Sequence, residues 1–266
     1  MLGLTRGGSV VFSCVQTCAE ICCTGATMLT IDEFAKLFRF FAVTAGFRAY
    51  TPANAEHRDF LDTVGERIGE KYVIGDFIAG NWRRKRCSML AADRTCRLHE
   101  SGFKPMQCQI VPLCAVFPES VQPDVLAQQQ AGAFRGCWGF QDGTRTGAIL
   151  WDAGRIVNED IREPFYRYRE GMVRQRIYLQ TILNALKGED AYHRMLAGKT
   201  MLEAAWPADL LLGLLHQAGF SPEQTRTYIT VQSEMCRQEL DATPEATVFQ
   251  DSLLELQAAQ RCIGSL

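Results

Sequence analysis

The segment Phe12–Cys23, FSCVQTCAEICC, contains four of the eleven cysteines of the chain. On an unbroken helix Cys14 and Cys22 would lie about 12 Å apart, at a rise of 1.5 Å per residue. A zinc–sulfur bond is only about 2.3 Å long, so one ion could not bind both thiols. We therefore expect either a bent segment or thiols that serve more than one metal atom. The alternative is a buried helix face, since these cysteines align at helical spacing and cysteine is often buried.

A second group, Cys87, Cys96 and Cys108, has the wide spacings of a loop, and Cys114 and Cys137 follow it. Glycine and proline recur up to Trp151 without a persistent period, which predicts irregular backbone held in place by bonds to metal. Residues 83–104 carry seven basic side chains and two acidic ones. Because ligating cysteines are thiolates, this positive charge would stabilise a thiolate site. A solvated basic loop would show the same pattern.

Together, FSCVQTCAEICC and the later CSMLAADRTCRLHESGFKPMQCQIVP resemble the CxxCxxCC cysteine-cluster family. Its YkgJ-like members are described as zinc- or iron-chelating proteins, and the flagellin lysine N-methylase belongs to it. The resemblance covers residues 12–140. The residues that match the later part of the family pattern are Cys87, Leu90, Cys96, Leu98, His99, Pro105, Cys108, Pro112 and the run Cys137-Trp138-Gly139.

The resemblance implies a set of metal ligands. The implied ligands are Cys14, Cys18, Cys22, Cys23, Cys87, Cys96, Cys108 and Cys137. The first group departs from the family pattern, because three residues separate its cysteines where the pattern has two, so the cluster geometry cannot be carried over. Cys114 has no counterpart in the pattern. His99 occupies a position where the family often has tyrosine, which favours an orienting or packing role over a ligand role.

The identity of the metal stays open between zinc and iron–sulfur. Zinc modules commonly use repeated C-x2-4-C pairs, and bacterial ferredoxins use the run C-x2-C-x2-C-x3-C. This chain has neither arrangement. Eight thiolates could hold two zinc ions or one or two iron–sulfur clusters. The crowded first group and the family description favour iron–sulfur.

Composition narrows the class of protein. The 266 residues include 28 basic and 30 acidic side chains, giving a net charge of -2, which argues against a nucleic-acid or membrane-surface binder. The apolar run at 210–215 is far shorter than the roughly 20 residues that span a bilayer. The opening MLGLTRGGSV lacks an apolar stretch of signal-peptide length, so we expect a cytoplasmic protein. In a reducing compartment, clustered thiols bind metal or do chemistry more often than they form disulfides.

Local patterns predict a mainly α fold with a small irregular α+β cysteine-rich metal-binding part. Thr30 and Glu33 have the capping-box spacing, as do Ser221 and Gln224, and each pair predicts the start of a helix. A strand is expected at 71–78. The expected helices cover residues 31–46, 53–69, 161–186, 189–206, 208–218, from 222 onward, and from 244 to about 262. We divide the chain into a cysteine-cluster metal-binding domain, 1–150, and a helical domain, 151–266.

These patterns favour a metal-binding cysteine-cluster protein with an accessory, maturation or electron-handling role. The rival hypothesis is a protein lysine N-methylase of the flagellin-methylase type, although no glycine-rich cofactor turn between a strand and a helix is present. Either hypothesis leaves room for a protein partner or a protein substrate. A plain helical domain with incidental cysteines is the third alternative. Cys236 and Cys262 are expected to be core cysteines, and the remaining histidines, His57, His193 and His216, to be surface or core residues.

Overall fold

The computed structural model describes residues 9–12, 21–79, 87–99, 101–132, 134–137, 139, 148–198 and 201–264. Helices dominate this part of the chain, which confirms the mainly α expectation. The helices are α1 (Ile31–Leu37), α2 (Ala55–Val64), α3 (Met106–Ile110), α4 (Gln122–Ala131), α5 (Glu159–Ala185), α6 (Asp190–Leu196), α7 (Ala208–Gln217), α8 (Pro222–Ala242), α9 (Thr247–Gly264) and the short 3-10 helices η1 (Ile21–Thr24) and η3 (Glu119–Val121). The strands are β1 (Val10–Phe12), β2 (Thr27–Leu29), β3 (Val43–Tyr50), β4 (Glu66–Ile68), β5 (Lys71–Ala79), β6 (Ala148–Asp152), β7 (Arg155–Ile156) and β8 (Leu202–Ala204).

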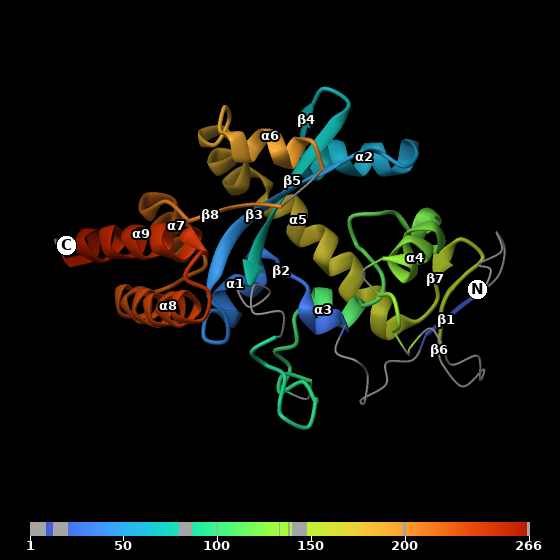
Figure 1. The fold of residues 1–266 in the computed structure, drawn as a ribbon, viewed down its shortest axis with the longest axis horizontal. Helices are drawn as coiled ribbons and strands as arrows, with labels where there is room; N and C mark the ends of the chain where they lie inside the picture. Colours follow the sequence, from blue (N-terminus) through green and yellow to red (C-terminus); the bar gives the residue numbers. More distant parts are fainter. Residues whose placement is uncertain are drawn as a thin grey trace.

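The central sheet is antiparallel, with strand order β2-β5-β3-β8 and with β4 also paired to β5. Strands β3 and β5 pair along their length, from Val43 opposite Ala79 to Tyr50 opposite Tyr72. Side chains alternate between the two faces of a strand, so each face of this sheet serves a different core. Phe47 and Phe77 belong to the larger core, which also contains residues of α7, α8 and α9. Tyr72 belongs to the smaller core. A second sheet, β1-β6-β7, lies at the end of the molecule opposite α7, α8 and α9 (Figure 1).

Helix α5 connects the two cores by passing the edge of β5. Strands β2 and β4 pair with the two ends of that edge and leave residues 74–76 without a strand partner there. Gln175 of α5 lies at this opening: its Nε2 donates to the Gly75 carbonyl at 3.1 Å, and its Oε1 accepts from the Ile31 amide at 3.1 Å. The helix approaches closely, since a Cβ on Gly75 would lie 2.7 Å from the Cβ of Leu179. Gln175 therefore replaces part of the missing strand pairing.

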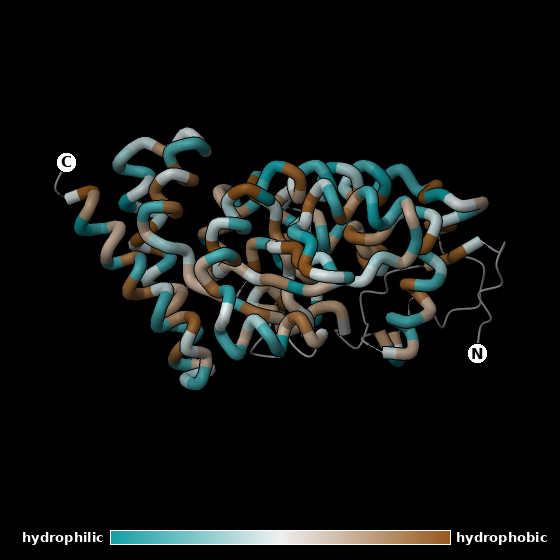
Figure 2. The backbone as a smooth tube through the Cα atoms, turned by 90° about the horizontal axis from the view of Figure 1, so that it is seen from above, coloured by the Kyte–Doolittle hydropathy of each residue, from teal (hydrophilic) through white to brown (hydrophobic). Residues whose placement is uncertain are grey.

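The C-terminal helices α7, α8 and α9 lie at the end of the molecule opposite β1 and β6 (Figures 1 and 2). Gln232 of α8 ties them to the sheet: it accepts from the Val43 amide at 2.9 Å and donates to the carbonyls of Phe38 and Phe41 at 2.6 and 2.8 Å. Strand β8 also comes from beyond residue 150 and pairs with β3. The two expected parts of the chain, 1–150 and 151–266, thus share one sheet, and the boundary between them stays a prediction.

Several helix starts are confirmed, and three expected helices end earlier in the structure than the sequence predicts. Glu33 accepts from the Thr30 amide and hydroxyl at the start of α1, and Ser221 accepts from the Gln224 amide at 3.2 Å at the start of α8. The helix expected at 31–46 ends at Leu37, because the apolar residues that follow form β3 against β5. The helix expected at 189–206 ends at Leu196, where Gly198 takes a positive φ of 72° and β8 follows.

The third of these helices also ends early because a strand follows it. The helix expected at 53–69 is α2, which ends at Val64, and β4 follows it because residues 66–68 pair with β5. The strand expected at 71–78 is confirmed as β5, and the long helix expected at 161–186 is confirmed as α5. The expected irregular region after Cys87 contains the short helix α3 and the helix α4. These helices are brief enough that turns still make up much of the region.

Candidate functional site

The first cysteine group is described only at its end. Cys22 and Cys23 lie in the short helix η1, with their sulfur atoms 3.9 Å apart. Cys22 is exposed and Cys23 is half-buried. The expected ligands Cys14 and Cys18 lie outside the described residues. The geometry of the adjacent pair is therefore the part of the first group that can be examined.

The structure brings this pair to two cysteines of the second group. The amide of Cys87 donates to the Cys23 carbonyl at 2.8 Å. Cys108 lies on α3, and negative charge on Cys108 or Cys87 would raise the pKa of the Cys23 thiol. These four cysteines, Cys22, Cys23, Cys87 and Cys108, are called the thiol group below. The members from the two sequence groups are more than sixty residues apart along the chain, so the fold is what makes them neighbours.

The electrostatics of the thiol group are uneven. The hydrogen bond from Cys23 is the largest cause that lowers the pKa of Cys22, to about 7. The same bond raises the pKa of Cys23, and burial adds to that rise. Burial, followed by the charge of Cys87, raises the pKa of Cys108 to about 12. The positive charge of Lys104 lowers the pKa of both Cys22 and Cys108. The arrangement therefore sets one thiol apart as the readiest to ionise.

A buried glutamate positions the helix that carries Cys108. Glu33 accepts from the Met106 amide at 2.6 Å through Oε1, while its Oε2 accepts from the Thr30 amide at 2.9 Å. The same carboxylate thus satisfies orphan backbone donors at the starts of α1 and α3. The sequence predicts the bond to Thr30 but carries no local signal for the bond to Met106, because these residues are far apart along the chain. The neighbouring Gln107 also accepts from the Met28 amide of β2.

The other described members of the expected ligand set are Cys96 and Cys137, both half-buried. Cys96 forms an isolated bridge with Leu90, and its side chain packs against the larger core. The Cys137 amide donates to the Phe134 carbonyl at 2.9 Å. Among the described residues, no three cysteine, histidine, aspartate or glutamate side chains stand in an arrangement that could hold a metal ion. The complete ligand set, and the metal, stay predictions.

The cysteines outside that set have separate surroundings. Cys236 is buried in the larger core, as expected, and burial raises its pKa to about 12. The expectation for Cys262 is wrong: it is exposed near the end of α9, because its helix turns this position away from the core. Cys114 packs against the smaller core, and burial raises its pKa as well.

Among the histidines, His57 is fully buried and its Nδ1 accepts from the Ala53 amide at 3.1 Å, so it is a core histidine. Burial lowers the pKa of His57 to about 4. His193 and His216 are exposed. His99 is exposed too, and its Nδ1 lies 3.5 Å from Lys104 Nζ.

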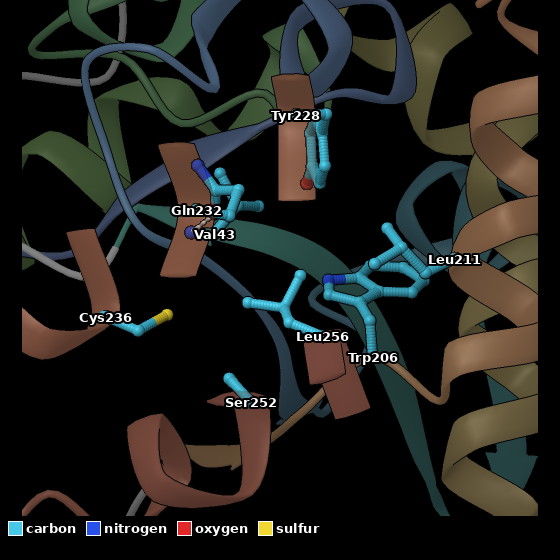
Figure 3. Close-up of a pocket in the computed structure, with 8 residues that line it drawn as sticks. All are labelled: Val43, Trp206, Leu211, Tyr228, Gln232, Cys236, Ser252 and Leu256. Atoms are coloured by element: carbon cyan, nitrogen blue, oxygen red, sulfur yellow. Dashed lines mark hydrogen bonds between the residues drawn. The ribbon is translucent and has the colours of Figure 1, made fainter. Parts of the chain in front are cut away.

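A cavity of about 10 Å³ lies between β3 and the C-terminal helices (Figure 3). A space of this size holds at most one water molecule. Trp206 and Cys236 line it, together with Gln232 and Ser252, and the indole Nε1 of Trp206 has no hydrogen-bond partner there. Such a cavity is a feature of core packing and is too small for a substrate or cofactor.

The chain matches no protein-family model, no curated protein and no solved structure. Its resemblance to the CxxCxxCC family therefore stays an expectation from the residues quoted above. Within the described ranges, no helix combines the length and the apolar character needed to cross a bilayer. A cytoplasmic location and the nature of any partner stay predictions.

Proposed function

We propose that this protein binds an inorganic metal centre through cysteine thiolates and serves an accessory, maturation or electron-handling role. In this proposal the thiol group supplies ligands together with Cys96, Cys137 and the first two cysteines of the chain. An iron–sulfur cluster is favoured over zinc. The protein acts on, or together with, another protein rather than a nucleic acid.

One observation carries the proposal: two separate cysteine groups meet in space. The Cys87 amide bonds to the Cys23 carbonyl at 2.8 Å, and Cys108 interacts electrostatically with both Cys87 and Cys22. The hydrogen bond with Cys22 and burial are the main causes that raise the pKa of Cys23, and negative charge on Cys22, Cys87 and Cys108 adds to the rise. A bound cation would remove the repulsion between these charges, because metal coordination replaces the proton on each thiol. Cysteines of both sequence groups that the fold brings near one another suit such a centre better than they suit a core, and the remaining ligands and the bound metal are part of the proposal.

The surroundings of the thiol group also suit thiolate ligands. Lys104 places a positive charge near Cys22 and Cys108, and the Thr27 hydroxyl donates to the Cys108 sulfur. Charge near a centre and hydrogen bonds to its sulfurs tune the potential of an iron–sulfur cluster. When bound, such a cluster would supply one-electron chemistry, whereas zinc would supply only structure or Lewis acidity. Glu33 would keep α3, and with it Cys108, in position for either metal.

The test is anaerobic purification of the full chain, followed by analysis of metal and acid-labile sulfide and by an absorption spectrum. A brown protein with stoichiometric iron and sulfide would support the favoured form of the proposal. A colourless protein with stoichiometric zinc would support thiolate binding but reject the iron–sulfur form. A folded protein with neither metal, also after anaerobic reconstitution with each, would reject the proposal altogether.

Matched variants locate the centre. Cys22→Ser and Cys108→Ser each remove a sulfur of the thiol group, whereas Cys262→Ser removes an exposed cysteine of α9. We expect the first two variants to lose most of the bound metal and the third to retain it. Equal metal content in all three proteins would show that the thiol group is not the binding site.

A further inference from the structure

A pocket of about 160 Å³ lies beside the start of α3, where α1 and α3 both pack against α5. Its walls come from α1, from residues 102–104, from α3 and from the N-terminal turns of α5. The volume is roughly ten times that which one water molecule requires. It is below the about 300 Å³ of pockets that hold drug-sized ligands. The pocket therefore has room for a small organic molecule, unlike the cavity beside Trp206.

Three carboxylates line this pocket, and each of them already has a partner. Glu33 is buried and accepts hydrogen bonds at the starts of α1 and α3. Asp32 forms an ion pair with Arg174, and Glu163 forms one with Arg167 at 3.6 Å. A cationic ligand would have to compete with these existing contacts.

Two lysines of the pocket differ from the carboxylates in this respect. The ammonium group of Lys36, which is exposed on α1, forms no ion pair within the described residues. Lys104 is half-buried, and its Nζ lies 3.5 Å from His99 Nδ1 rather than beside a carboxylate. With Arg174 counted, four basic side chains are gathered with three acidic ones. Lysine ammonium groups bind carboxylates and phosphates as point charges, so these two are available to an anion.

The pocket also has an apolar wall that includes an exposed aromatic ring. Phe103 is 44% exposed, and its ring centroid lies 5.5 Å from that of Phe40. Leu37, Met106 and Pro164 are buried and line the same space. Apolar surface combined with a few polar groups is typical of sites for small organic ligands, because the polar groups fix the orientation of an apolar body.

We propose that this pocket binds a small organic anion, whose charged group is held by Lys36 and Lys104 and whose apolar body rests against Phe103. The ligand carries a carboxylate or a phosphate on a compact, flat body. Both parts contribute to affinity, since the lysines attract the charge and the aromatic wall removes apolar surface from water. Inorganic anions and uncharged or cationic rings satisfy only one of these contacts.

The pocket adjoins the thiol group without including a cysteine. Met106 and Gln109 line it and come from α3, the helix that carries Cys108. Lys104 is close enough to act electrostatically on both Cys22 and Cys108. A ligand in the pocket would therefore lie beside the proposed metal centre. Its binding does not depend on a metal, so failure of this proposal would leave the proposed function untouched.

The experiment is a ligand-observed NMR titration of the purified full chain at low ionic strength with benzoate and with phenyl phosphate. Acetate and inorganic phosphate keep the charge without the ring, and benzylamine keeps the ring with the opposite charge. We expect saturable binding of benzoate or phenyl phosphate and at least tenfold weaker binding of the three comparison compounds. The tighter of the two aromatic anions identifies the preferred charged group, and either result supports the proposal.

Matched variants locate the ligand. Lys36→Gln and Lys104→Gln should each weaken the binding about tenfold, as expected when one charge-assisted hydrogen bond is removed. Phe103→Ala should weaken it as well, through the loss of apolar contact. Arg237→Gln removes one positive charge from the exposed side of α8, outside the pocket, and should leave the affinity unchanged. Circular dichroism reports whether each variant is folded, and the exposed position of Lys36 makes Lys36→Gln decisive if Lys104→Gln does not fold.

Four results would overturn the proposal. Neither aromatic anion binds saturably, which would mean that the pocket holds only water. One of them binds, but folded Lys36→Gln and Phe103→Ala retain the affinity, which would place the ligand elsewhere. Acetate or inorganic phosphate binds as tightly as the aromatic anions, which would show that charge alone is recognised. An acetylated tetraglutamate peptide binds more tightly than either aromatic anion, which would make the pocket part of a docking surface for an acidic protein segment.

Discussion

Replacing Asp76 by asparagine should remove a pH-dependent component of stability that acts in an unusual direction. Burial is the main cause that raises the pKa of Asp76 from 3.8 to about 6, against the opposing effects of Tyr168, Arg48 and Gln175. The folded chain then holds the proton of Asp76 more tightly than the unfolded chain does. Between about pH 4 and pH 6 the folded state binds more protons, so this residue makes the free energy of unfolding fall as pH rises.

The magnitude follows from the change in pKa. A rise from 3.8 to about 6 corresponds to about 3 kcal/mol at full ionisation. Asparagine is uncharged at every pH, and its amide oxygen can still accept from Tyr168 and Gln175. We therefore expect Asp76→Asn to be less stable than, or equal to, the wild-type chain near pH 4. The variant should gain about 3 kcal/mol relative to the wild type by pH 7.5.

The assay is urea unfolding at several pH values, followed by far-UV circular dichroism. The informative quantity is the difference in free energy of unfolding between wild type and variant, because contributions from other groups, including the buried Glu33, cancel in it. Asp251→Asn, in an exposed position, serves as the control and should give a difference independent of pH. A constant difference between wild type and Asp76→Asn from pH 4 to 7.5 would refute the reasoning. It would mean that Asp76 is solvated well enough to ionise normally.

Three further substitutions test how the cores and the thiol group are held. Gly171→Ala should destabilise the chain by about 1–3 kcal/mol, because its Cβ would lie 2.5 Å from the Thr30 side chain. Gly213→Ala, at an exposed helical site with open space, should stabilise the chain by about 0.5–1 kcal/mol. Equal shifts in the melting temperatures of the two variants would contradict this reasoning. Gln232→Ala should cost at least about 2 kcal/mol by leaving buried backbone groups of the β3 region unpaired, whereas Gln238→Ala on the exposed side of α8 should cost much less in the same urea titration. Glu33→Ala should speed the reaction of Cys108 with a thiol reagent at least tenfold by releasing the start of α3, and an unchanged rate would show that Glu33 does not position it.

The sequence is a good guide where the signal is local. The capping residues at Thr30 and Ser221 act within one helical turn, so their helices begin where the pattern predicts. The residues after Leu37 are apolar at a spacing that a helix and a buried strand both allow. Pairing with β5, which is determined by distant residues, decides in favour of a strand. For the same reason β8 could not be foreseen, because it exists only through its pairing with β3.

The candidate sites also depend on contacts between distant residues, which the sequence does not show. The two cysteine groups can be recognised in the sequence, and the resemblance predicts that they meet, but the sequence cannot show which thiols are adjacent. No pattern in the sequence indicates that Asp76 is buried, because a charged residue within a strand usually points to solvent. Only the passage of α5 over the edge of β5 buries it beneath Tyr168 and Gln175. A buried carboxylate of this kind is a property of the tertiary structure alone.

The positions of the thiols relative to the two cores indicate how much of the fold would depend on a bound metal. Neither buried core includes Cys22 or Cys23 among its described members, and Cys22 is exposed. The central sheet and both cores are closed by apolar side chains and by residues such as Gln175 and Gln232. Cys22→Ser should therefore lower the metal content with little change in the melting of the sheet. The alternative is that a bound metal organises the whole first half of the chain. Hydrogen exchange should show lost protection around residues 87–99, and global unfolding of the variant would show instead that the metal does hold that half together.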